Sequence, residues 1–297
     1  TATPCAPPTA QKDQPITLSS YSHNLTHTTF AVRLLRSPAA RLLALLCALV
    51  LAAWLGHHAT QRRLGVLVPE RIVAIDDFPE LSGIAYLPGR GTLLGVGDNG
   101  EIAEITLEGK VLRKRMHAGR DFEDIALPAQ PGHALATDAQ HGLLLTISLA
   151  DLAIVAERAV PAASIPTRRR SKRIEGLALA GQPPRLVLAN ERPPALVFLD
   201  GGPAAPRTLL LDADSLSGVT AGPQGELLLV SRDNGLRLLD ADGRALGPWH
   251  PVAYHHLEGA ALVPGVGLVL CADRKPGILL IFPSLRNWAA LRHALAS

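Results

Sequence analysis

Two sets of oxygen-bearing side chains recur along this chain, and most of them are carboxylates. The first set contains Ser82, Glu123, Glu175, Ser217 and Glu258. The second set follows 15 or 16 residues after the first and contains Asp98, Asp138, Glu191, Asp233 and Asp273. If these residues meet in the fold, the cluster needs raised carboxyl pKa values, interleaved cations or a bound metal ion.

A metal ion and a set of arginines are both available as solutions. Oxygen ligands without His or Cys at the repeated positions suit Ca²⁺ better than Zn²⁺. We therefore predict a calcium site with Glu123, Glu175 and Glu258 as its ligands, inside an outer ring formed by the second set. The cations that could interleave with the acids are Arg192, Arg232, Arg274 and Lys275.

Two structural explanations for the acidic residues stay open beside the calcium site. An aspartate before Asn-Gly, as at Asp98 and Asp233, is ordinary hairpin-turn chemistry. The three glutamates of the first set could instead cap strand amides or hold channel water. His255 and His256 could serve as an acid or base beside the acids, or lie in a solvated loop.

The elements that must position these residues are repeated units. The first-set residues are separated by 41, 52, 42 and 41 residues, and each opens a short apolar strand bounded by Gly, Pro, Asn and Asp. A period near forty with this pattern predicts four-stranded propeller blades. In the first copy we expect strands at residues 83–86, 92–96, 101–107 and 111–117.

The last copy has only three strands, so we expect residues 71–77 to supply its outer strand and close the ring. The fold predicted is all-β, a five-bladed β-propeller, with six blades as the alternative. Because the first strand of a blade is innermost and antiparallel to the second, both acidic sets should surround one mouth of the central channel.

The chain ahead of the propeller divides into three segments. Residues 1–32 are polar and are predicted to be a disordered tail. Residues 33–59 read as a signal anchor or transmembrane helix, with arginines before fourteen apolar residues. We predict that it is retained in the inner membrane with the propeller in the periplasm; cleavage and secretion to the periplasm is the alternative. Residues 60–69 form a linker, residues 70–283 the propeller and residues 284–297 a short C-terminal helix.

The net charge and the motif content limit the classes of partner that we expect. The net charge is only +3, and the basic run at residues 167–173 lacks interleaved aromatic residues, so nucleic-acid binding is not expected. The sequence contains no Walker loop, no G-x-S-x-G elbow and no H-E-x-x-H motif. The expected partners are the inner membrane and an unknown ligand or protein at the mouth.

Several phrases resemble one protein family. These are "ELSGIAY", "GDNGEIAEITLEGKVLRK", "DFEDIA", "RIEGLALA" and "LANERPPALVFLD", in this order. The sequence is similar over residues 70–283 to the SdiA-regulated (YjiK-like) β-propeller proteins. The resemblance implies a five-bladed propeller at the inner membrane that faces the periplasm, with calcium at the channel and no established activity. The chain departs from the family pattern at Asp124, where a glycine is usual.

Two functions from different classes remain. One is a membrane-anchored binding module that recognises an extracytoplasmic ligand or protein and uses calcium structurally. The other is a calcium-dependent hydrolase of an ester or phosphoester, similar to propeller phytases and lactonases, with one of the three glutamates as ligand or base. The fold does not choose between them, so the sequence leaves enzymatic activity undecided.

Overall fold

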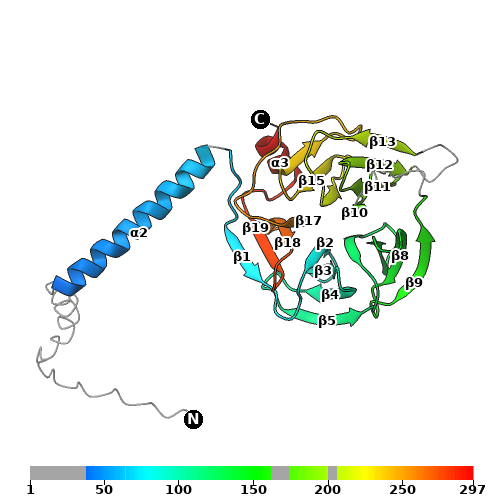
Figure 1. Ribbon diagram of the computed structural model, residues 1–297, viewed down its shortest axis with the longest axis horizontal. Coiled ribbons are helices and arrows are strands. Elements are labelled where there is room, and N and C mark those ends of the chain that lie inside the picture. The colour runs from blue at the N-terminus through cyan, green and yellow to red at the C-terminus, as the bar shows by residue number, and fades with distance from the viewer. Residues whose placement is uncertain (1–37, 64, 162–173, 200–205, 297) are drawn as a thin grey trace, which may run out of the picture. The chain divides into compact units, whose positions relative to one another are not determined.

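Five β-sheets form the blades of a ring in the computed structural model of the protein (Figure 1). The structure describes residues 38–63, 65–161, 174–199 and 206–296. The five blades in these residues confirm the predicted propeller. The predicted tail, residues 1–32, and the basic run, residues 167–173, lie outside the described residues.

Each blade is an antiparallel meander whose first strand is innermost. Blade one contains β2 (Leu81–Leu87), β3 (Thr92–Gly97), β4 (Glu101–Ile105) and β5 (Val111–Met116). Blade two contains β6 (Phe122–Ala126), β7 (His133–Asp138), β8 (Leu143–Ser148) and β9 (Ile154–Ala159). Blade three contains β10 (Ile174–Ala180), β11 (Arg185–Asn190), β12 (Ala195–Leu199) and β13 (Arg207–Leu210). Blade four contains β14 (Gly218–Ala221), β15 (Leu227–Ser231) and β16 (Gly235–Leu239). Blade five contains β17 (Leu257–Val263), β18 (Gly267–Ala272), β19 (Ile278–Phe282) and β1 (Arg71–Ala74).

The two ends of the propeller close the ring, as the sequence predicted. Strand β1 pairs antiparallel with β19, with Arg71 opposite Ile281 and Ala74 opposite Ile278. The N-terminal strand therefore completes the last blade, which removes a free sheet edge that would otherwise be open to association.

Blade four differs from the predicted four-stranded pattern. Between β16 and β17 the chain makes only isolated bridges, and two of these, Leu239 with Ala245 and Leu236 with His250, join it to β16. Gly247 and Pro248 lie between these two bridges. Proline cannot donate to a ladder and glycine weakens a strand, so this outer segment does not form a regular strand.

The core consists of five apolar clusters, one at each interface between neighbouring blades. Alternate residues of an inner strand face opposite blades: Ile84 packs with blade five, whereas Ala85 packs with blade two. This period of two is the geometry of a β-strand. Because both faces of every blade are covered, the strands read as nearly continuous aliphatic runs.

Glycine is required at the tight turns. In the "DNG" turns, Gly100 and Gly235 have φ values of 85° and 88°, a region that L side chains rarely adopt. A Cβ at either position would lie 2.2 Å from a backbone oxygen, that of His117 or His250. These glycines let the outer part of each blade pack against the hairpin.

Two helices lie outside the blades. Helix α2 (Pro38–Arg63) includes a 19-residue stretch, Pro38–Gly56, that is long and apolar enough to cross a membrane, and its leucines are exposed. It extends four residues beyond the predicted segment. Leu67 is already paired with Val252, so the hydrogen bonding of the propeller begins within the predicted linker.

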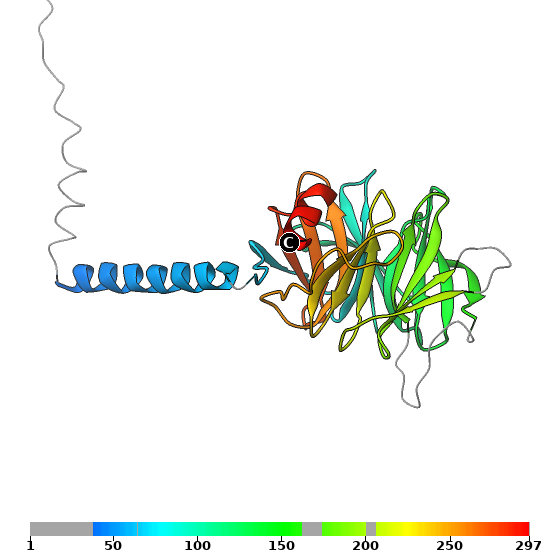
Figure 2. The ribbon, with the colours of Figure 1, turned by 90° about the horizontal axis from the view of Figure 1, so that it is seen from above.

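Helix α3 (Trp288–Leu295) packs beside blades four and five through Leu291 and Leu295. Figure 2 shows the blades edge-on with α3 beside them. The helix is shorter than predicted because Asn287 caps it, with its side chain accepting from Ala290 N at 2.8 Å.

Candidate functional site

The first-set residues lie where the inner strands begin, and bulges direct most of them. In blades one, two, three and five the register shifts at this point, for example between Leu81 and Gly83 and between Ile174 and Gly176. A β-bulge redirects a side chain out of the regular alternation. We use the name carboxylate mouth for this end of the channel, where Ser82, Glu123, Glu175, Ser217 and Glu258 lie.

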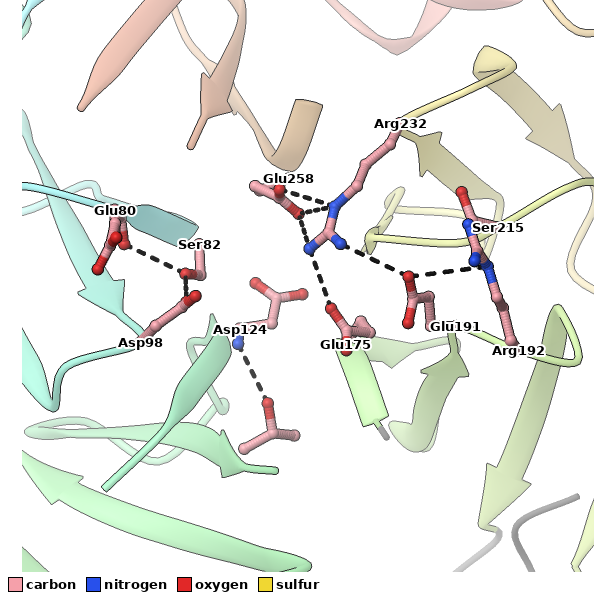
Figure 3. Close-up of polar contacts among 12 residues, drawn as sticks. Glu80, Ser82, Asp98, Asp124, Glu175, Glu191, Arg192, Ser215, Arg232 and Glu258 are labelled. Atoms are coloured by element: carbon pink, nitrogen blue, oxygen red, sulfur yellow. Dashed lines mark hydrogen bonds and ion pairs between the residues drawn. The ribbon is translucent and has the colours of Figure 1, made fainter. Parts of the chain in front are cut away.

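Arg232 lies among three glutamates of the carboxylate mouth (Figure 3). Its Nε and Nη2 atoms donate to Oε1 and Oε2 of Glu258 at 2.8 Å each. Nη2 also lies 3.3 Å from Glu175 Oε2, and Nη1 lies 3.5 Å from Glu191 Oε1. All three glutamates are buried. A single guanidinium therefore connects blades three and five.

Blade four supplies this cation and has no carboxylate in the first set. Its first-set residue is Ser217, and Arg232 follows β15 of the same blade. Burial lowers the pKa of Arg232, but Glu258, Glu175 and Glu191 outweigh that effect, so its pKa lies above the ordinary value. The guanidinium stays charged.

Burial raises the carboxyl pKa values of two glutamates of the mouth. Burial, followed by Glu175, Asp98, Asp121 and Glu258, raises the pKa of Glu123 to about 10. Burial also raises the pKa of Glu258 well above its usual range, against the lowering effect of Arg232. Burial and the neighbouring acids therefore favour the protonated form of Glu123.

Asp98 belongs to the same group of acids, although it lies exposed at the rim. Loss of solvation raises its pKa, the hydrogen bond from the Ser82 hydroxyl lowers it, and Asp121 and Asp273 raise it. Ser82, the first-set residue of blade one, thus holds Asp98 in the mouth. Asp273 acts on both Asp98 and Glu258 through its charge.

Two second-set residues are held by other groups. Asp138 is buried, accepts from Arg120 Nη1 at 2.9 Å and lies 2.9 Å from His141 Nδ1. Asp233 is exposed and accepts from the Ser215 hydroxyl at 2.8 Å. The predicted outer ring is therefore not one uniform ring, since only some of its members act on the first set.

The other residues considered from the sequence lie toward solvent. Lys275 contacts Glu80 at 2.7 Å, and Arg192 lies 3.7 Å from Asp233. Arg274, His255 and His256 are exposed. Among the four candidate cations, Arg232 is the one placed at the centre of the mouth.

Ser217 places a buried hydroxyl at the mouth, and the described residues give it no hydrogen bond. The residue is 2% exposed, and its hydroxyl has no hydrogen-bond partner within the described part of the chain. Leaving a buried hydroxyl unpaired costs about 1–3 kcal/mol. A bound water or ligand atom at this point would remove that cost.

Asp124 lies on the channel axis below the mouth, and the sequence alone did not indicate this. Its carboxylate accepts from the backbone N of Leu177 and of Ile125 at 2.7 and 2.8 Å, and also from that of Val219. The corresponding residues in the other blades are glycines; a Cβ on Gly83 would lie 2.6 Å from Asp124 Cα. The signal in the sequence was this single exception to a repeated glycine.

Comparison with known proteins gives the family. The model of the SdiA-regulated family matches residues 66–248, more than half of the chain. The protein is a member of the SdiA-regulated family. No curated protein matches it.

Among solved structures, this SdiA-regulated protein is similar to the glutaminyl cyclase of Myxococcus xanthus, with a TM-score of 0.55 and 13% identity. The match covers 73% of this chain and 99% of that one. At this identity the likeness shows the fold alone.

The predicted calcium site of this family member does not fit the side chains as they lie. Ca²⁺ needs six to eight oxygen ligands, but Arg232 lies among Glu258, Glu175 and Glu191 where such an ion would have to be. Within residues 38–296, outside the gaps given above, no group of three or more His, Cys, Asp or Glu side chains is arranged to hold a metal. Binding by these glutamates would require Arg232 to leave them, and calcium stays a prediction.

Proposed function

We propose that this SdiA-regulated protein is a membrane-anchored binding module whose carboxylate mouth takes a cationic group of an extracytoplasmic ligand or protein. One observation carries the proposal: carboxylates gather at the mouth, where burial and the charges of Glu175 and Glu258 raise the pKa of Glu123 to about 10. A positive charge placed beside these carboxylates would be stabilised by them. An organic ammonium or guanidinium group is the occupant that best matches the chemistry.

The electrostatic attraction supports the binding of a group that carries a single positive charge. A unit charge 4 Å from one carboxylate gains about 4 kcal/mol at an effective dielectric constant of 20. The ligand would also displace the proton of Glu123, because a nearby positive charge stabilises the ionised carboxyl. Affinity should therefore increase as the pH rises toward the raised pKa of Glu123. The Ser217 hydroxyl, which has no hydrogen-bond partner among the described residues, offers a hydrogen bond beside this charge.

The apolar stretch of α2 supports the anchoring part of the proposal. We assign it to the inner membrane, with the basic residues before it in the cytoplasm and the propeller in the periplasm. A signal sequence that is cleaved would pass the same test of length and composition. Extraction from membranes separates a retained anchor from a cleaved signal sequence. A protein with a retained anchor should resist carbonate and high-salt washing and be released by detergent.

The calcium-dependent hydrolase has less support from the geometry. Two of its three candidate glutamates, Glu175 and Glu258, contact Arg232 instead of offering open ligand positions. The TM-score match to a cyclase concerns the fold and does not assign a reaction. The binding function is therefore the better supported of the two.

Thermal unfolding of the full-length protein in detergent tests the proposal. The probes are spermidine, arginine amide and CaCl₂, each compared with NaCl at the same ionic strength because salt alone screens charges. A ligand that binds only the folded state raises Tm. We expect spermidine and arginine amide to raise Tm beyond the NaCl control, and more so at pH 8.5 than at pH 6.

Variants locate the effect. Glu123→Gln and Asp98→Asn should abolish the response, whereas Glu108→Gln, an exposed turn residue in blade one, should retain it. A calcium-specific rise that is lost in Glu175→Gln would instead support the metal site. Equal responses in all variants would show that the cations do not bind at the mouth.

A further inference from the structure

A second chamber lies in the channel at the end away from the carboxylate mouth. It has a volume of about 310 Å³ and is lined by the later halves of β2, β6, β10, β14 and β17 together with Trp288. At ~30 Å³ per water this space equals about ten waters. The volume of the chamber is at the lower limit for small-molecule sites.

The chamber is separate from the mouth. None of the first-set residues Glu123, Glu175 and Glu258 lines it. Its floor is Asp124, whose carboxylate is already hydrogen-bonded to backbone N–H groups of β6, β10 and β14. The inner strands also approach closely at this level: a Cβ on Gly218 would lie 2.2 Å from Glu258 O. A ligand in the chamber therefore cannot be in contact with the carboxylate mouth.

The walls offer hydrogen bonds without charge. Strands β2, β6, β10, β14 and β17 are each at the end of a sheet and pair on one side only. The backbone N–H and C=O groups of their free edges therefore face the channel and need partners. Asp124 accepts three of these N–H groups. Apart from Asp124 and Tyr86, the described lining residues have no ionisable side chain.

The rim is apolar and firmly held. Tyr86, Leu127, Leu179 and Leu262 line it and are half-buried, as is Trp288. The Trp288 indole lies against blade four, where a Cβ on Gly222 would be 2.9 Å from it. An ion pair between Arg292 of α3 and the buried Glu226 fixes the helix. A preorganised aromatic wall loses little entropy when it binds a ligand.

We propose that this chamber is a binding site for a small uncharged molecule that combines amide-type donors and acceptors with an apolar or aromatic group. The amide part pairs with the free strand edges, and the apolar part contacts Trp288 and the leucines of the rim. An anion is excluded because no cationic side chain lines the chamber. A cation is disfavoured because burial raises the pKa of Asp124, whose carboxyl oxygens already accept three backbone N–H groups. This site is independent of the one proposed at the carboxylate mouth.

Tryptophan fluorescence of the full-length protein tests the chamber. The probes are N-acetyl-leucine amide and N-acetyl-phenylalanine amide, with N-acetyl-leucine as the anionic counterpart. In a Trp54→Phe/Trp249→Phe background, Trp288 is the remaining tryptophan. We expect a saturable change in its emission with either amide, and about tenfold weaker binding of the anion.

Variants and NMR of the wild type decide the location. Ala221→Phe fills the chamber from the half-buried side of β14 and should weaken binding at least about tenfold, whereas Glu123→Gln at the other mouth should leave it unchanged. Should Ala221→Phe fail to fold, as circular dichroism would show, methyl NMR of the wild type should show amide-induced shifts at Ala126 and Ala261. No saturable change with either amide, unchanged binding in folded Ala221→Phe, or unmoved methyl signals would overturn the proposal.

Discussion

Replacing Glu123 by glutamine should remove much of the pH dependence of stability near neutrality. In the folded protein the pKa of Glu123 is raised to about 10, whereas the ordinary value is 4.5. The folded state therefore binds this proton more tightly than the unfolded state between these two values. The contribution of Glu123 to stability is greatest below pH 4.5 and falls as the pH rises toward 10.

The size of the effect follows from one proton. A single group with this difference lowers the free energy of unfolding by about 1.4 kcal/mol per pH unit. From pH 6 to pH 8 the wild type should lose about 2.7 kcal/mol from Glu123, which for a domain of this size is a fall in Tm of about 5–11 °C. Glutamine has nearly the shape of the protonated glutamate and does not titrate.

Urea unfolding at pH 6, 7 and 8 measures this difference. The wild type should lose stability more steeply than Glu123→Gln over this range, and Glu123→Gln should be the more stable protein at pH 8. Glu108→Gln makes the same chemical change at an exposed turn and should keep the wild-type slope. Equal slopes for the wild type and Glu123→Gln would refute the argument that the mouth holds a proton on Glu123.

Two further predictions concern the walls of the mouth. Arg232→Met should lower stability at pH 7 by about 3 kcal/mol, because it removes the guanidinium that contacts three buried carboxylates, and the loss should shrink at pH 4. The exposed Arg192→Met should cost under about 1 kcal/mol in the same urea assay. Gly218→Ala should cost more than about 2 kcal/mol, since its Cβ would lie 2.2 Å from Glu258 O, whereas Gly89→Ala, which has open space around it, should be nearly neutral by thermal unfolding. Similar losses in either matched pair would contradict these contacts.

The position of the acids was predictable because it follows from local repetition. Each first-set residue begins an inner strand, and strands that alternate apolar residues with turn residues at a period near forty pack as blades. The bulges between Leu81 and Gly83 and between Ile174 and Gly176 could not be read from that pattern. Bulges depend on the register between two strands, and this register is set by packing in the closed ring.

The contacts of individual side chains across the ring could not be predicted from the sequence either. Arg232 was one of four candidate cations, and its neighbours Asp233 and Asn234 suggested only a turn. Its long side chain crosses to Glu175 of blade three and Glu258 of blade five, and a small Ser217 in its own blade replaces the carboxylate found in those two blades. No local pattern encodes a contact between residues 57 positions apart, as between Arg232 and Glu175.

The sequence by itself indicated the repeat, five blades as the favoured number, a closing strand within residues 71–77 and the family, because these depend on periodicity and on matched phrases. The tertiary structure decided which acids share Arg232, that Asp124 accepts backbone N–H groups of three blades, and that Asp124 and Trp288 line one chamber. The physical reason is that charge compensation and cavities arise between blades. They depend on distances across the ring, whereas the sequence pattern reports only what lies along one chain segment.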